Sequence, residues 1–328
     1  MTDLRSRFTS LSIIRKVTGF LTKSDLWRRF SSGVFWSLIG NTFLRVLNAV
    51  STILVARILG PQVYGEYGLI LSTIRMISVY ARFGLGPTTI KYVAELREKD
   101  PQRANRILQL SMFLSFYLCS AISIVLLAGS GFFARIILDN QELSLGLGIG
   151  AIMLFFMVYG ETKQLALAGF ESFRKIAIIN AVRGIATPLA CIPLAFYWGT
   201  PGALAGLTIA TMLLLVSSTY YLRKTTRKAG FSARVSLRDK LSELPVLWRY
   251  ALPGVLTGMV VTAMMWTGRL LLTKQEAGYT QLGLFEAAYQ WQTLILFMPS
   301  VLLQVVFPIL SETFGRTNKD DFNSALSI

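Results

Sequence analysis

The chain has 328 residues and a formal net charge of +16; 53% of the residues are hydrophobic, 15% are charged, and none is histidine. Soluble domains carry about 25% charged residues, so this composition, with its long apolar runs, is typical of a polytopic helical membrane protein. The absence of histidine excludes imidazole acid–base catalysis and histidine-ligated metal sites. Cys119 and Cys191 match no metal or redox spacing, and we expect no cofactor and no metal.

The positive charge follows from 33 lysines and arginines against 17 acidic residues. In membrane proteins, basic residues collect in cytoplasmic loops, and this explains the excess without a nucleic-acid partner. Evidence for an anionic ligand has to come from cations inside the membrane spans.

Residues 1–33 form a basic arm that we expect in the cytoplasm, either as a short helix on the anionic leaflet or as an unstructured tail. The apolar segments after it predict eight membrane-spanning helices. These are residues 34–59, 64–84, 107–129, 143–169, 177–198, 203–222, 250–273 and 281–310. Basic residues fill alternate loops, so the amino terminus is predicted to lie in the cytoplasm.

The spans divide into two unequal groups. Residues 34–222 predict a six-helix lobe, residues 223–249 a basic cytoplasmic linker, and residues 250–328 two further helices. The later part echoes the beginning, since residues 268–271 (GRLL) resemble residues 56–59 (ARIL). We therefore predict two similar lobes in parallel orientation, the second incomplete after two helices, as in a fragment or a truncated product.

The first span carries Asn41, Arg45, Asn48 and Thr52, spaced by four, three and four residues, which places them on one helical face. The second span carries Arg75 near its middle. A cation at bilayer depth costs about 2.5–3.5 kcal/mol, a cost that water, a counter-ion or an anionic ligand can offset. This pattern predicts an internal cavity that holds an anion.

Four arginines are the candidate ligands of that anion. We expect Arg45 and Arg75 to hold it, with structural pairing inside the bundle as the alternative. Arg82 and Arg183 lie nearer the predicted cytoplasmic side and are expected to receive it on entry, unless their side chains reach out to the surface.

Other polar residues leave two interpretations open. Asn41 and Asn48 either line the cavity or form hydrogen bonds between helices. Glu161 either carries a coupling proton, since burial favours a neutral carboxyl, or forms a structural ion pair with another helix. Arg269 stands at the predicted outer end of its span, where we expect an interfacial anchor; pairing with Glu286 is the alternative.

Four segments resemble the polysaccharide and O-antigen flippases of the multidrug/oligosaccharidyl-lipid/polysaccharide exporter superfamily. They are residues 55–69 (VARILGPQVYGEYGL), 83–100 (FGLGPTTIKYVAELREKD), 269–290 and 307–322 (FPILSETFGRTNKDDF). The resemblance implies two six-helix bundles around a central cavity. The chain departs from the family pattern in ending after the eighth span, and in having Gly268 where relatives often place an aspartate before the arginine.

The same resemblance implies that the protein moves a polyprenyl-diphosphate-linked oligosaccharide from the inner to the outer leaflet of a bacterial or archaeal plasma membrane. It would then work beside polysaccharide polymerase and glycosyltransferase machinery and would perform no enzymatic step. One alternative is a multidrug extruder of the same superfamily, although a pump for cationic drugs needs acidic residues in its cavity. Another is a membrane enzyme acting on lipid-linked sugars, although the predicted outer loops are too short to hold its catalytic groups.

Overall fold

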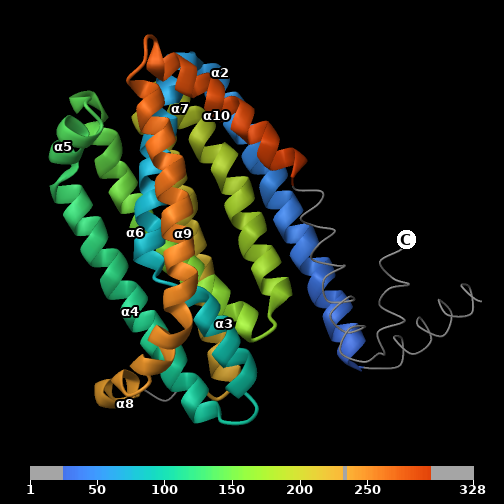
Figure 1. Ribbon diagram of the computed structural model, residues 1–328. Coiled ribbons are helices and arrows are strands. Elements are labelled where there is room, and N and C mark those ends of the chain that lie inside the picture. The colour runs from blue at the N-terminus through green and yellow to red at the C-terminus, as the bar shows by residue number, and fades with distance from the viewer. Residues whose placement is uncertain (1–24, 232–234, 297–328) are drawn as a thin grey trace, which may run out of the picture.

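The computed structural model describes residues 25–231 and 235–296, and all regular structure in that part of the chain is helical (Figure 1). The elements are α2 (Asp25–Arg82), α3 (Leu85–Leu96), α4 (Pro101–Ala128), α5 (Ser130–Phe132), η1 (Phe133–Ile137), η2 (Gln141–Leu143), α6 (Ser144–Gly169), α7 (Phe173–Lys228), α8 (Leu237–Leu241), α9 (Leu244–Thr273) and α10 (Gly278–Ile295). The predicted helical membrane bundle is confirmed. Most of the basic arm and the second half of the eighth predicted span lie outside the described residues.

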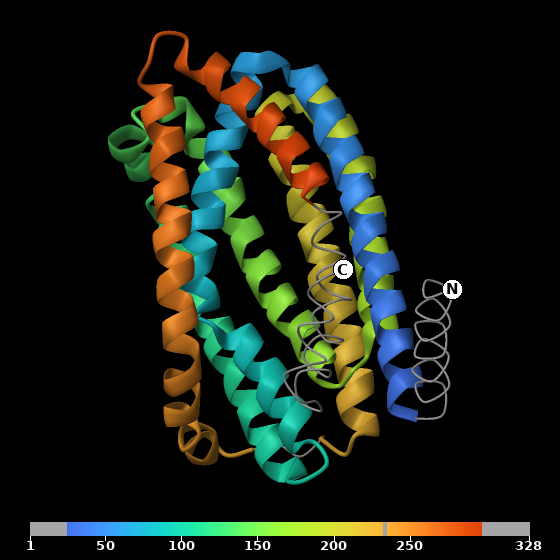
Figure 2. The ribbon, with the colours of Figure 1, turned by 45° about the vertical axis from the view of Figure 1, so that its right-hand side comes forward.

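The two longest helices each supply two spans. A straight helix of 58 residues, the length of α2, would be ~87 Å long, about three times the thickness of a bilayer core. Instead α2 reverses at Gly60 (φ 73°) and α7 reverses at Gly199 (φ 60°), both in the left-handed region that glycine adopts without strain. Figure 2 shows the two halves of α2 meeting at the top of the picture and running down from there in opposite chain directions.

Several predicted boundaries differ from the structure. Helix α2 begins at Asp25 and not at residue 34, and α3 lies where a loop was predicted, because Gly84 (φ 65°) turns the chain and allows a new helix to begin. Helix α4 begins at Pro101, where the Asp100 side chain accepts a hydrogen bond from the Arg103 backbone N–H. A capping aspartate followed by proline is a strong helix start, and it extends α4 beyond its apolar segment.

Helices α2, α6 and α7 share an apolar core. Ile70 and Ile74 of α2 are fully buried against Leu147 and Leu154 of α6 and Leu204 of α7. Gly146 and Gly150 of α6 face α2 and keep the two helices close. A Cβ at either position would collide with the side chain of Ile70 or Ile74. Helices α2, α6 and α7 therefore pack closely together, and the predicted division into lobes stays a prediction.

Close contact between α2 and α10 joins the first lobe to the later helices near the reversal at Gly60 (Figures 1 and 2). A Cβ at Gly65 would collide with the backbone carbonyl of Tyr279, and a Cβ at Gly283 would collide with that of Pro61. Only glycine fits at these two positions. Helix α9 contacts the second half of α2 farther from the turn, where the Trp266 indole N–H donates a 2.9 Å hydrogen bond to the Thr73 hydroxyl.

At the opposite end of the bundle, the predicted linker packs on α4. Glu243, at the start of α9, is only 6% exposed and pairs with Arg103 at 3.2 Å and Arg106 at 3.5 Å. The Val235 backbone N–H donates a hydrogen bond to the Gln109 side chain. The beginning of α9 is thus held at this end, which we call the basic end.

We expect Gly65→Ala and Gly283→Ala each to destabilise the folded protein by about 1–3 kcal/mol, because the added methyl forces two helix backbones apart. The measurement is the thermal unfolding midpoint of the purified protein in detergent. Gly268→Ala is the matched control, since it lies in a helix and a Cβ there meets nothing within 4 Å. Unchanged midpoints for both variants would contradict the close contact.

Candidate functional site

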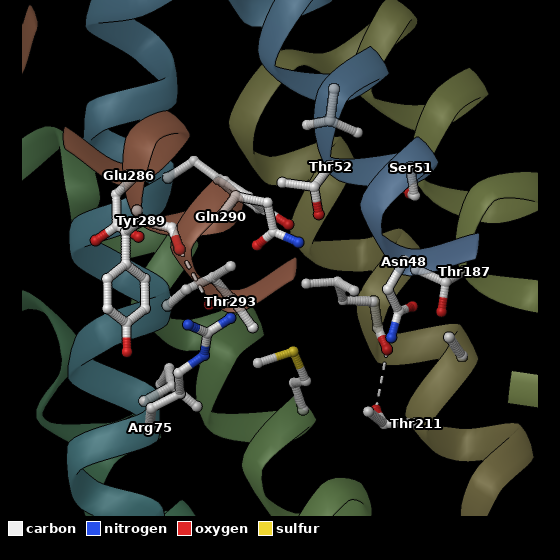
Figure 3. Close-up of a pocket in the computed structure, with 18 of the residues that line it drawn as sticks. Asn48, Ser51, Thr52, Arg75, Thr187, Thr211, Glu286, Tyr289, Gln290 and Thr293 are labelled. Atoms are coloured by element: carbon white, nitrogen blue, oxygen red, sulfur yellow. Dashed lines mark hydrogen bonds between the residues drawn. The ribbon is translucent and has the colours of Figure 1, made fainter. Parts of the chain in front are cut away.

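A cavity of about 470 Å³ lies between both halves of α2, α6, α7 and α10. The sequence-predicted residues Arg45, Asn48, Arg75 and Arg183 all contribute to its lining. Figure 3 shows the Arg75 guanidinium and the Gln290 amide pointing into this space. The cavity is therefore cationic, and helices from before and after the predicted linker contribute to it.

The reversal at Gly60 brings two of these arginines to the same depth. Arg45 and Arg75 each lie fifteen positions from Gly60, on opposite halves of α2, which places both ~22 Å from the turn. Both side chains are solvent-exposed, although they lie far from either helix end. Among the residues that the structure describes, no carboxylate forms an ion pair with Arg75.

Small polar side chains line the side of the cavity across from Arg75 (Figure 3). They are Asn48, Ser51 and Thr52 of α2 and Thr187 and Thr211 of α7. The two α7 threonines donate hydrogen bonds to carbonyls of their own helix, and a hydroxyl oxygen used in this way can still accept a bond from a ligand. This polar side suits a ligand with many hydroxyl groups.

Arg82, Glu161 and Arg183 form a cluster on the basic-end side of the cavity. Arg82 Nη2 lies 2.8 Å from Glu161 Oε2, and Arg183 Nη1 lies 3.5 Å from Glu161 Oε1. Arg183 lines the cavity and Arg82 does not. Glu161 therefore forms ion pairs with two other helices, and its role in proton coupling stays a prediction.

Asn41 also stands outside the cavity lining. Its amide oxygen accepts a 3.0 Å hydrogen bond from Asn180, which in turn accepts one of 2.6 Å from Gln164. This chain of amides joins α2, α7 and α6. Asn41 and Asn48 were predicted to share one helical face, but their surroundings differ, and only Asn48 lines the cavity.

Helix α10 contributes further residues to the lining of the cavity. Glu286, Tyr289 and Gln290 all line the cavity. Glu286 pairs with Arg269, and the Arg269 guanidinium also lies 5.0 Å from the centre of the Tyr289 ring. Glu286 and Tyr289, three residues apart, lie on one face of α10.

The expectation that Arg269 is an interfacial anchor is wrong. The exposed fraction of Arg269 is 7%. Helix α10 passes so close to α2 that the Glu286 side chain lies directly against Gly68, where a Cβ would collide with it. The buried carboxylate then requires a cation, and Arg269 supplies it despite the glycine at position 268.

An apolar groove of about 390 Å³ opens beside the cavity, between the first half of α2 and α10. The two share lining residues, namely Thr52, Tyr64, Gln290 and Leu294. The remaining groove lining is mostly apolar, with Ile53, Ala56, Leu284, Ala287 and Trp291. A polar, cationic space thus passes directly into an apolar one, an arrangement that matches an amphiphile with an anionic head.

We expect Glu286→Gln to destabilise the protein by about 3–5 kcal/mol, because it leaves the Arg269 cation buried without its counter-ion. The double variant Arg269→Leu/Glu286→Leu should lose less, since neither charge is then left alone. Thermal unfolding of both variants in the same detergent checks this order. A double variant less stable than Glu286→Gln would show that the pair is not the reason for the loss.

Comparison with known proteins identifies relatives of the chain among polysaccharide export proteins. It is 25% identical to the EPS I polysaccharide export inner membrane protein EpsE of Ralstonia nicotianae, over 70% of this chain and 52% of that protein. It is also 25% identical to EpsE of Ralstonia solanacearum, over 84% of this chain and 63% of that protein. The chain thus spans less than two thirds of the length of these relatives.

Among solved structures, an inward-facing multidrug resistance MATE family transporter of the MOP superfamily has the same fold. Its TM-score is 0.70 with 16% sequence identity, and the match covers 88% of this chain and 68% of that one. The family model described as polysaccharide biosynthesis protein matches residues 30–314. The chain therefore belongs to the polysaccharide biosynthesis protein family.

Proposed function

We propose that this protein is a flippase that moves a polyprenyl-diphosphate-linked oligosaccharide from the inner to the outer leaflet for cell-surface polysaccharide synthesis. The observation that carries the proposal is the junction between the cationic cavity and the apolar groove, which matches the two ends of such a molecule. Membership of the polysaccharide biosynthesis family and likeness to the EPS I export proteins support it.

The headgroup is held by guanidinium groups in this account. A diphosphate is a compact multiple anion, and each guanidinium offers a planar fork of donors that stays charged at any working pH. Contacts between charges are stronger in a cavity walled by protein than in bulk water. Arg45 and Arg75, at equal depth, are proposed to bind the diphosphate, and Arg183 is proposed to bind it nearer the basic end.

The glycan and the lipid tail take different places. Sugar hydroxyls would form hydrogen bonds with the polar side of the cavity, where Asn48, Thr52 and Thr187 lie. The prenyl chain would follow the groove past Trp291 into the bilayer. Because lipid is as apolar as the groove, the groove orients the tail and adds little binding energy.

A cationic drug fits this cavity poorly. Its described lining includes three arginines and one carboxylate, Glu286, and that carboxylate is already paired with Arg269. Arg183 is likewise paired with Glu161, but Arg75 forms no ion pair among the described residues, so the lining keeps a positive charge that repels a cationic ligand. The proposed flippase would work in the inner membrane with the basic end in the cytoplasm, beside glycosyltransferases and a polymerase.

The double variant Arg45→Ala/Arg75→Ala should abolish surface polysaccharide, because the headgroup loses its two mid-depth cations. The measurement is cell-surface polysaccharide in a strain that depends on this chain, with membrane fractions probed for the protein. Arg135→Ala is the control. Arg135 is exposed and outside the cavity, and it lies near the end of the bundle where α2 reverses at Gly60, which we call the turn end. Normal polysaccharide from the double variant, at normal protein levels, would overturn the proposal.

A further inference from the structure

We propose that Glu161 is an exchangeable counter-ion that occupies a phosphate-binding position between Arg82 and Arg183. In this inference, which rests on the proposed function, the carboxylate holds the two arginines in the empty transporter and gives up Arg183 when a diphosphate arrives. The position would be a loading site between the basic end and the cavity.

The three side chains come from three different helices of the first lobe, α2, α6 and α7. Arg82 is 43% exposed, Glu161 24% and Arg183 23%, so exposure is greatest at the end of α2 and falls toward the cavity. An anion arriving from the basic end would meet Arg82 first and Arg183 second. Arg183 then presents it to the cavity that Arg45 and Arg75 share.

The two ion pairs of Glu161 are unequal. The pair with Arg82 is 2.8 Å long, whereas the pair with Arg183 is 3.5 Å long. The looser contact is therefore the one on the cavity side, where a ligand would compete. The cavity-side bond can break while the bond to Arg82 stays intact.

A second ion pair in the same protein shows what a permanent one looks like. The side chains of Arg269 and Glu286 are only 8% and 11% exposed, and aromatic rings cover the guanidinium. Water and ligands have little access to that pair. Glu161 and its partners are two to five times as exposed, as an exchangeable site requires.

The charge of the cluster also favours a phosphate. Two guanidinium groups against one carboxylate leave one positive charge uncompensated. A diphosphate carries more negative charge than a carboxylate, so it can replace Glu161 at Arg183. The neighbouring Lys163 does not take part, since its ammonium donates a 2.8 Å hydrogen bond to Thr219 and lies over the Tyr159 ring.

Return of the carboxylate would complete the exchange. Once the diphosphate has moved on to Arg45 and Arg75, Glu161 can pair with Arg183 again and close the position behind it. Removal of the carboxylate should then strengthen binding and slow transport. An ion pair with a purely structural role would not weaken the binding of a diphosphate.

The test measures binding of farnesyl diphosphate and of inorganic pyrophosphate to the purified protein in phosphatidylcholine nanodiscs by calorimetry. Glu161→Gln should bind both probes about tenfold more tightly, a difference of ~1.4 kcal/mol, while surface polysaccharide falls. Glu161→Asp keeps the carboxylate, so its affinity for the probes and its surface polysaccharide should match those of the unmodified protein. Arg82→Gln should weaken binding, because Glu161 is then left to Arg183 alone. Glu142→Gln, an exposed carboxylate near the turn end, is the matched control.

Binding by Glu161→Gln that is unchanged or weaker, with Glu161→Asp equally affected, would overturn the counter-ion role. The same outcome would leave the proposed function standing if Arg45→Ala/Arg75→Ala still lost binding. Failure of the unmodified protein to bind either probe would instead count against the flippase itself. An effect on farnesyl diphosphate alone would show that the lipid chain, and not the phosphate, is sensed.

Discussion

The structure depends on the cost of an arginine at bilayer depth. A guanidinium cannot lose its charge, so each such residue needs water, a carboxylate or an anionic ligand. The protein shows two solutions. Arg269 is closed off with Glu286 against aromatic rings, whereas Arg45 and Arg75 stand at equal depth in an open cavity. The second arrangement places both guanidinium groups on the lining of a cavity that a ligand can enter.

The backbone makes the open arrangement possible. Reversal at Gly60 turns one long helix into two antiparallel spans and so carries two arginines to one level. Close contact at Gly65 and Gly283 then brings α10 over the cavity and supplies Tyr289 and Gln290. Because α10 also forms one side of the apolar groove, the same contact creates the junction that an amphiphile would occupy.

The helical bundle and the cavity arginines were predictable from the sequence. The surroundings of Asn41 and Arg269 were not, for physical reasons. Apolar length and charge gave the helical bundle, and helical spacing gave Arg45 and Asn48 a common face. Spacing along one helix cannot say which helix lies opposite, so Asn41 was grouped with them although it bonds Asn180. The burial of Arg269 depends on how closely α10 approaches α2, a property of backbone contact that no single stretch of sequence encodes.

The electrostatic character of the cavity is the central claim, and thiol reactivity measures it directly. In protein with Cys119 and Cys191 replaced by alanine, Thr293→Cys places a thiol at the cavity, and Gly131→Cys places one on the exposed surface near the turn end. A negatively charged methanethiosulfonate should react faster than a positively charged one at position 293, by about tenfold relative to the ratio at position 131. Equal ratios at the two positions, or a preference for the cation at 293, would contradict a cavity built to hold an anion.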